Sequence, residues 1–212
     1  MIQQKFFNFN FKEDYSSENF FVSRSNIEAC TKILDKKASL SSIILKGPAK
    51  SGKTHLGLVW QKKYNAIKYC NSDFRNILNQ NRNIFYDDLF YDLNEEYLFH
   101  LINHCYNNNL KIIISTEKSL SNHDFKIKDL SSRLKSFHVV EIKDPDDHLL
   151  NNLLMKLLYD KQIIINKNEV FSFIIKRINR TYLDVYRFVE KIDKLSLEKK
   201  RELTIPLIKE LL

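Results

Sequence analysis

The feature that most limits what this chain can fold into is the segment Gly47–Thr54, which reads GPAKSGKT. It matches the phosphate-binding loop pattern G-x-x-x-x-G-K-[ST] at every fixed position. The two glycines let the backbone curl so that successive amides face one centre, at the positive end of the following helix. Lys53 adds a full positive charge for the outer phosphates, and Thr54 offers a hydroxyl to a magnesium ion. The segment therefore predicts a site for ADP or ATP with Mg²⁺.

The flanking sequence has the form that this motif requires. A short apolar run with strand character, residues 42–45, precedes the loop, and residues 55–60 have helical character. The chain has only 3 glycines, and two of them stand at the two glycine positions of the motif, so a chance match is disfavoured against a lysine-rich turn. The residues expected to contact nucleotide here are Gly47, Pro48, Ala49, Lys50, Ser51, Gly52, Lys53, Thr54 and His55.

A second part of the same chemistry is predicted from residues 84–88, an apolar strand, IFY, that ends in two carboxylates. At the end of a strand beside the loop, Asp87 would order the Mg²⁺ shell and Asp88 would polarise the attacking water. An ordinary strand that ends in an acidic turn is the alternative. The strand at residues 110–114 is followed by polar residues, of which Thr116 is a candidate for contact with the terminal phosphate; a plain strand cap explains it equally well.

Composition sets the class of protein. With 43% hydrophobic and 12% aromatic residues in 212, the chain can build a real core. The net charge of +8 allows a weak affinity for polyanions. Cys30, Cys70 and Cys105 are odd in number and far apart, which argues against disulfides or a zinc site. No signal peptide or membrane span is evident, so we expect a cytoplasmic protein with no membrane partner.

Hydrophobic periodicity predicts an α/β protein with a change of character near Pro145. Five strands alternate with helices before this point, and four helices follow it. We expect three parts: an N-terminal segment at residues 1–15, an α/β core at 16–144 and a small all-α lid at 145–212. Asn26 or Ser25 is expected to cap the first helix, and an aspartate before Pro145 to cap the first lid helix.

The N-terminal segment is rich in phenylalanine. Gln4–Phe9 resembles the glutamine-plus-hydrophobic peptide by which bacterial proteins bind the replication sliding clamp, with Gln4, Phe6, Phe7 and Phe9 as the candidate contacts. Lys5 stands where that peptide usually has leucine, and Asn8 where it usually has proline. The alternative is that these rings fold back onto the domain or form a strand.

Two other candidates are ambiguous from the pattern alone. His100 and His104 share one helical face at metal-ligand spacing, but without a positioned partner they are better explained as surface histidines. Arg133, in the run DLSSRL, is first interpreted as a solvated charge on an exposed helix.

The order of these parts resembles the AAA+ ATPases, and more narrowly the bacterial replication initiator DnaA and its shortened relatives of the Hda type. The resemblance rests on five stretches of this sequence: ENFFVSRSN, GPAKSGKTHL, DLSSRL, the PDD helix start and the terminal LTIPLIKELL. It covers essentially the whole chain. It implies an AAA+ P-loop NTPase fold, a five-stranded parallel core followed by a helical lid. We also expect neither the DNA-binding domain nor the helicase-recruiting domain of DnaA.

The resemblance also assigns roles. Arg133 matches the family's arginine finger, which reaches a nucleotide held by a neighbouring subunit. Phe21 and Val22 match the segment beside the nucleotide. The family's lid arginine falls at Leu183, so Arg180 or Arg187 would have to replace it.

The implied function is regulation of DNA replication. Such a protein binds the sliding clamp, contacts DNA only through it, and stimulates ATP hydrolysis by DnaA, so that re-initiation is prevented. Its own ATPase activity would be weak or absent. A small-molecule P-loop kinase and a helicase-loader ATPase are the alternatives.

Overall fold

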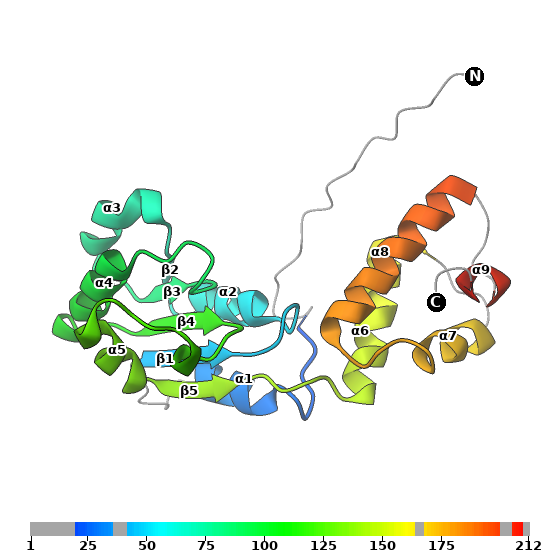
Figure 1. The fold of residues 1–212 in the computed structure, drawn as a ribbon, viewed down its shortest axis with the longest axis horizontal. Coiled ribbons are helices and arrows are strands. Elements are labelled where there is room, and N and C mark those ends of the chain that lie inside the picture. Colours follow the sequence, from blue (N-terminus) through cyan, green and yellow to red (C-terminus); the bar gives the residue numbers. More distant parts are fainter. Residues whose placement is uncertain (1–19, 36–41, 164–167, 200–204, 210–212) are drawn as a thin grey trace, which may run out of the picture.

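Five parallel strands form the centre of the protein, in the order β2-β3-β4-β1-β5 (Figure 1). The computed structural model describes residues 20–35, 42–163, 168–199 and 205–209. The strands are β1 (Ser42–Lys46), β2 (Ile67–Lys68), β3 (Ile84–Tyr86), β4 (Ile112–Thr116) and β5 (His138–Glu141). This confirms the predicted five-stranded parallel sheet.

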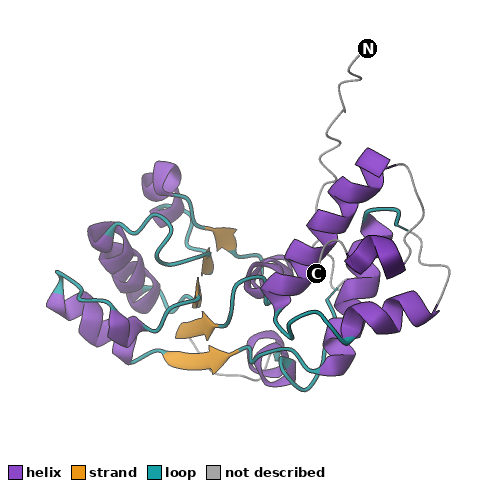
Figure 2. Cartoon of the chain, turned by 45° about the vertical axis from the view of Figure 1, so that its right-hand side comes forward, coloured by secondary structure: helices purple, strands orange, loops and turns teal. Residues whose placement is uncertain are grey.

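Helices connect the strands and cover both faces of the sheet (Figure 2). In chain order they are α1 (Ile27–Leu34), α2 (Lys53–Lys63), α3 (Phe74–Leu78), α4 (Glu95–Asn107) and α5 (Lys128–Lys135), with short 3-10 turns at Asn71–Asp73 and Leu120–Asn122. Parallel strands need such crossovers because each chain segment must return to the same end of the sheet before the next strand begins.

Side chains alternate between the two faces of the sheet, as the period of a strand requires. On β1, Ile43 and Leu45 pack in a cluster with the buried side chains of α1 and α2. The intervening residue, Ile44, packs in a second cluster with α3, α4 and α5. Both faces are therefore buried, which explains why β1 and β4 are continuous apolar runs in the sequence.

Four helices follow the sheet: α6 (Asp147–Asp160), α7 (Asn168–Ile175), α8 (Tyr182–Lys199) and α9 (Ile205–Lys209). Their apolar faces form a third cluster of their own. Two residues of these helices, Leu149 and Tyr182, pack instead against the cluster around α1 and α2. The Tyr182 hydroxyl also donates a hydrogen bond to the Lys143 carbonyl at 3.2 Å, so the lid is attached at its base to the core.

The starts of α1 and α6 are not capped in the way that the sequence predicted. Asn26 precedes α1, but its side chain makes no cap hydrogen bond to the helix; it accepts from the Ser23 amide and donates to the Phe21 carbonyl. The residue that caps α6 is Asp146, which follows Pro145 and accepts from the Leu149 amide at 2.8 Å. The prediction of a capping aspartate before Pro145 was therefore wrong, because the helix begins two residues later.

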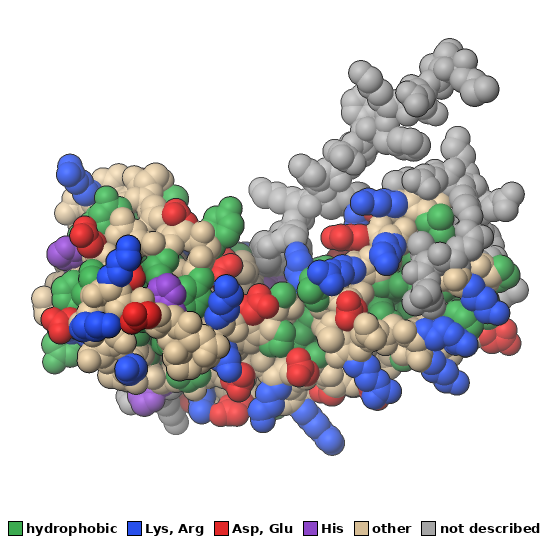
Figure 3. Space-filling view, viewed as in Figure 1, with side chains coloured by type: hydrophobic (Ala, Val, Ile, Leu, Met, Phe, Trp, Pro, Cys, Tyr) green, Lys and Arg blue, Asp and Glu red, His purple; other side chains and the backbone are tan. Residues whose placement is uncertain are grey.

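The surface shows no concentration of one charge on the face seen in Figure 3. Lys and Arg side chains lie over both the core and the lid, and acidic side chains lie among them. In the part of the chain that the structure describes, no helix combines the length and apolar character needed to cross a bilayer.

Candidate nucleotide site

The phosphate-binding loop lies at the carboxyl end of β1, between β4 on one side and β5 on the other. The chain leaves β1 at Lys46, forms the loop and enters α2 at Lys53. In an open parallel sheet, the carboxyl ends of neighbouring strands meet where connections diverge, and ligands bind there. The predicted strand, loop and helix are thus in the arrangement that the motif requires.

The loop backbone curls tightly and is closely packed at its two glycines. Gly52 has φ 90° and Lys50 has φ 62°, both in the left-handed region. A Cβ on Gly47 would lie 2.9 Å from Ser51 Oγ and 3.0 Å from Ile142 Cβ. Ser51 is only 5% exposed, and its hydroxyl has no hydrogen-bond partner among the described residues. A phosphate oxygen would satisfy that buried hydroxyl, so the loop fits the group that the motif predicts.

Lys53 lies across the loop that precedes it. Its ammonium donates to the carbonyls of Gly47 at 2.9 Å and Pro48 at 2.7 Å. Burial lowers the pKa of Lys53, while the charges of Glu117, Asp88 and Asp87 act in the opposite direction. The ammonium is therefore held at the loop by weak neutral acceptors, which anionic phosphate oxygens would replace with stronger charge-assisted bonds.

Asp87, directly after β3, is the centre of a hydrogen-bond network. Its Oδ1 accepts from the Thr54 hydroxyl at 3.0 Å and from the Ser115 hydroxyl at 2.8 Å. Its Oδ2 forms an ion pair with Lys68 Nζ at 2.9 Å. The structure thus brings together Thr54 and Asp87, the two predicted Mg²⁺ residues, although they are 33 residues apart in the sequence.

A magnesium ion at this point would depend on the nucleotide. Within the described ranges, no group of three or more His, Cys, Asp or Glu side chains could hold a metal by itself, and this includes the pair His100 and His104. Mg²⁺ keeps several waters and is commonly bound by one or two protein oxygens together with substrate phosphates. Thr54 and Asp87 fit that type of site, in which the metal neutralises phosphate charge.

Ser115 was not singled out in the sequence, yet it is the polar residue of β4 that reaches Asp87. It also accepts a hydrogen bond from the Asp88 amide at 2.8 Å. The neighbouring candidate, Thr116, is buried and donates its hydroxyl to the Lys118 carbonyl. Successive residues of a strand point to opposite faces, so the register of β4 against β3 decides which of the two contacts Asp87.

Asp88 is exposed and holds its backbone in the left-handed region, with φ 56°, just before a turn. Aspartate tolerates this conformation better than most residues, because its short side chain can bond locally. Its negative charge acts to raise the pKa of Lys53 in the loop, against the effect of burial. A role in polarising water remains a prediction.

The segment before α1 contacts the loop through a residue that the sequence did not indicate. The Phe20 ring lies edge-on to His55, with 5.1 Å between ring centroids, and one ring carbon is 3.1 Å from where a Cβ on Gly52 would stand. Phe21 is half-buried against the core, and Val22 is 53% exposed. The pattern identified the segment, but only packing shows which ring covers the loop.

The lid approaches the loop through Tyr186 of α8, over whose ring Lys50 Nζ lies at 5.1 Å from the centroid. Arg180 forms an exposed ion pair with Asp147 at 3.2 Å, and Arg187 lies 3.9 Å from Asp184 on its own helix. Leu183 is half-buried. Both arginines considered as lid contacts for the nucleotide are thus engaged with lid carboxylates here.

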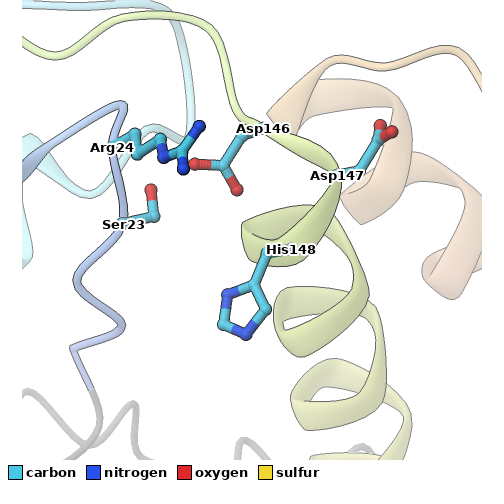
Figure 4. A pocket seen from close by; sticks show the side chains of 5 residues that line it. All are labelled: Ser23, Arg24, Asp146, Asp147 and His148. Carbon is cyan, nitrogen blue, oxygen red and sulfur yellow. The ribbon is translucent and has the colours of Figure 1, made fainter.

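A charged cavity of about 460 Å³ lies where the segment that precedes α1 meets the start of α6. It is lined by Ser23, Arg24, Asp146, Asp147 and His148 (Figure 4). The Arg24 side chain extends toward Asp146, whose pKa is held below its ordinary value by the Leu149 amide and, to a smaller extent, by Ser23 and the Arg24 amide. Asp146 therefore ties the base of the lid to this segment.

Arg133 is not part of the chain's own loop site. It lies on α5, half-buried, with its guanidinium 5.6 Å from the centre of the Phe99 ring on α4. The buried side chains of α5 pack on the face of the sheet opposite to α2. Residues 1–9, with the candidate clamp contacts, lie outside the described residues.

Comparison with known proteins shows the fold that this chain shares and the family that its C-terminal part resembles. Domain III of the replication initiation protein DnaA from Thermotoga maritima has the same fold, with a TM-score of 0.75 and 18% identity over 95% of this chain and 96% of that one. AMPPCP-bound DnaA from Aquifex aeolicus matches with a TM-score of 0.65 and 21% identity, over 86% of this chain and 65% of that one. Residues 154–212 match the family described as Hda, lid domain.

The chain has the fold of DnaA domain III, and its residues 154–212 are similar to the Hda lid family. The five-stranded parallel sheet followed by helices is the fold expected from the sequence, so the predicted fold class is confirmed. The match of residues 154–212 bears out the resemblance to Hda-type proteins over that part of the chain. An uncharacterized protein from Haemophilus influenzae is 30% identical over 101 residues, which is 48% of this chain and 43% of that protein. The match therefore spans less than half the length of this relative.

Proposed function

We propose that the protein is a regulator of DNA replication initiation: it holds ADP or ATP with Mg²⁺, docks on the sliding clamp and stimulates ATP hydrolysis by DnaA. Re-initiation would then be prevented. The observation that carries the proposal is the combination of an Hda-type lid with a DnaA-like AAA+ core. A structural neighbour binds AMPPCP, a nucleotide analogue, which supports a nucleotide in the loop.

The site geometry supports nucleotide binding by this chain. The loop contains the Ser51 hydroxyl, which has no partner among the described residues, the left-handed Gly52 and the Lys53 ammonium. Thr54, which follows Lys53, is hydrogen-bonded to Asp87. A bound nucleotide would supply phosphate charge for the loop amides and for Lys53, and would join the loop to the segment at Phe20 and to the lid.

The position of Arg133 supports action on a neighbouring molecule. Because α5 packs on the face of the sheet opposite to α2, the guanidinium is not presented to the chain's own loop. An arginine supplied in trans can raise the rate of phosphoryl transfer by about 10³ to 10⁵. An isolated chain would lack that group at its own nucleotide, which fits weak or absent intrinsic hydrolysis.

The test is ATP hydrolysis by DnaA in the presence of clamp and DNA. We expect Arg133→Ala to abolish the stimulation while leaving nucleotide binding by this chain intact. Arg177→Ala is the matched control, because Arg177 also stacks on a phenylalanine, Phe173, but lies in the lid. Normal stimulation by Arg133→Ala would remove the finger role.

Clamp docking is tested separately. We expect deletion of residues 1–9 to abolish co-elution with the clamp and to reduce stimulation of DnaA, while the melting temperature stays unchanged. Replacing both Phe6 and Phe7 by alanine should have the same effect, since aromatic anchors carry most of the affinity in such contacts. Unchanged co-elution after the deletion would show that the N-terminal segment is not the tether.

A further inference from the structure

Lys68 is placed at the predicted metal position by the sheet itself. It is the last residue of β2, paired in register with Phe85 of β3. Paired residues of parallel strands point to the same face, and Asp87 lies two residues beyond Phe85 and so returns to that face. The long lysine side chain covers the remaining distance and brings Nζ to 2.9 Å from Asp87 Oδ2.

With this ion pair, both oxygens of the Asp87 carboxylate have partners. Oδ1 already accepts from Thr54 and Ser115, so Lys68 takes the second oxygen. Asp87 is only 14% exposed, whereas Lys68 is 44% exposed at the edge of the sheet. The Lys68 ammonium therefore pairs with a carboxylate that is largely shielded from solvent. Salt and water screen a charge interaction there less than they do on the surface.

We propose that Lys68 is a built-in counter-charge for Asp87, which lets this chain hold its nucleotide with little dependence on Mg²⁺. The inference rests on the proposed nucleotide binding. Without a metal, an unpaired Asp87 would repel the phosphates, and Lys68 removes that repulsion. When Mg²⁺ is present, Lys68 competes with it for the same carboxylate, so the metal adds less to affinity than it would at a free aspartate.

The consequence is a change in the coupling between two ligands. Mg²⁺ and nucleotide each raise the affinity of the site for the other by one common factor, and Lys68 lowers that factor. A single charged neighbour at a partly exposed site changes an affinity by about five- to tenfold. Such an arrangement suits a protein that holds its nucleotide as part of its folded structure and does not hydrolyse it rapidly.

The experiment measures binding of a fluorescent ADP analogue to the full chain, with excess Mg²⁺ and with EDTA. We expect the wild-type affinity to change less than about threefold between the two conditions. In Lys68→Met the affinity in EDTA should fall about five- to tenfold, and the enhancement by Mg²⁺ should rise by the same factor. Lys68→Arg keeps the charge and should behave like the wild type.

Lys161→Met is the matched control, because Lys161 forms a similar partly exposed ion pair with Asp193 in the lid. It should leave the Mg²⁺ enhancement unchanged. Equal enhancement in wild type and Lys68→Met, with both proteins binding the analogue, would overturn the role of Lys68 and leave the nucleotide site standing. No binding by the wild type in either condition would overturn the nucleotide site itself, and this inference with it.

Discussion

Gly57, the third glycine of the chain, is where the structure makes its sharpest prediction about stability. It lies on α2, directly over the fully buried ring of Phe85 on β3. A Cβ at Gly57 would lie closer than 3.0 Å to three carbons of that ring, a separation that real Cβ atoms essentially never show. Optimal carbon contacts are about 3.5 to 4.0 Å, so the helix or the ring must move by well over an ångström.

The size of the effect follows from two opposing terms. Overpacking a well-packed core typically costs about 1 to 3 kcal/mol, and occasionally more. Replacing glycine by alanine inside a helix stabilises it by about 0.8 to 1 kcal/mol. Because Phe85 lies in the sheet interior between α2 and two flanking strands, it has little room to yield, and we expect the overpacking cost to be at the top of this range, about 3 kcal/mol. After subtraction of the helix-propensity gain, Gly57→Ala should destabilise the protein by a net of about 2 kcal/mol.

The assay is urea unfolding followed by the fluorescence of Trp60, the single tryptophan, which is buried on the same helix. Far-UV circular dichroism should report the same transition, which would justify a two-state fit. For a protein of this size the expected loss corresponds to a fall in melting temperature of about 2 to 4 °C per kcal/mol.

A double-mutant cycle separates the clash from other effects. In a Phe85→Leu background the ring is gone, so Gly57→Ala should become neutral or stabilise by up to about 1 kcal/mol. If Gly57→Ala is neutral in the wild type, or costs as much in both backgrounds, close packing of α2 on Phe85 is not what requires the glycine.

Three further predictions concern the core–lid junction and the thiols. Asp146→Ala should cost about 1 kcal/mol through loss of the α6 cap. Asp146→Asn keeps a capping oxygen but loses the charge, so it should be less stable than the wild type at neutral pH. This difference in the free energy of unfolding should shrink as the pH falls below about 3.8, because a carboxylate whose pKa is lowered by folding stabilises the protein only above its unfolded pKa. A difference in urea titrations that does not change with pH would contradict this. Tyr182→Phe should lose about 1 kcal/mol with its hydrogen bond to the backbone, and an unchanged urea midpoint would show that the bond contributes nothing. A thiol reagent should label Cys70 in the native protein, since this thiol is exposed and the Ser72 hydroxyl lowers its pKa. Cys30 and Cys105, with pKa values raised by burial to about 11 and about 12, should react only on unfolding, and equal native rates for all three would refute their burial.

Much of the fold could be predicted from local sequence signals. The helix Glu95–Asn107 depends on local signals, because its apolar stripe and its Asn94 cap are both visible in the sequence. The loop and the strand before it are fixed by glycine spacing and an apolar run, and the change near Pro145 follows from the end of strand patterning. These features depend on residues a few positions apart, and their chemistry is the same wherever they lie in the fold.

What only the tertiary structure decided are the contacts between distant segments. The placement of β4 between β3 and β1 brings Ser115 rather than Thr116 to Asp87, and register brings Lys68 to the same carboxylate. The packing of α2 on β3 makes Gly57 necessary. Strand order and register arise from the burial of whole faces and from crossover connections, which depend on the complete sheet and leave no local pattern at the residues that finally meet.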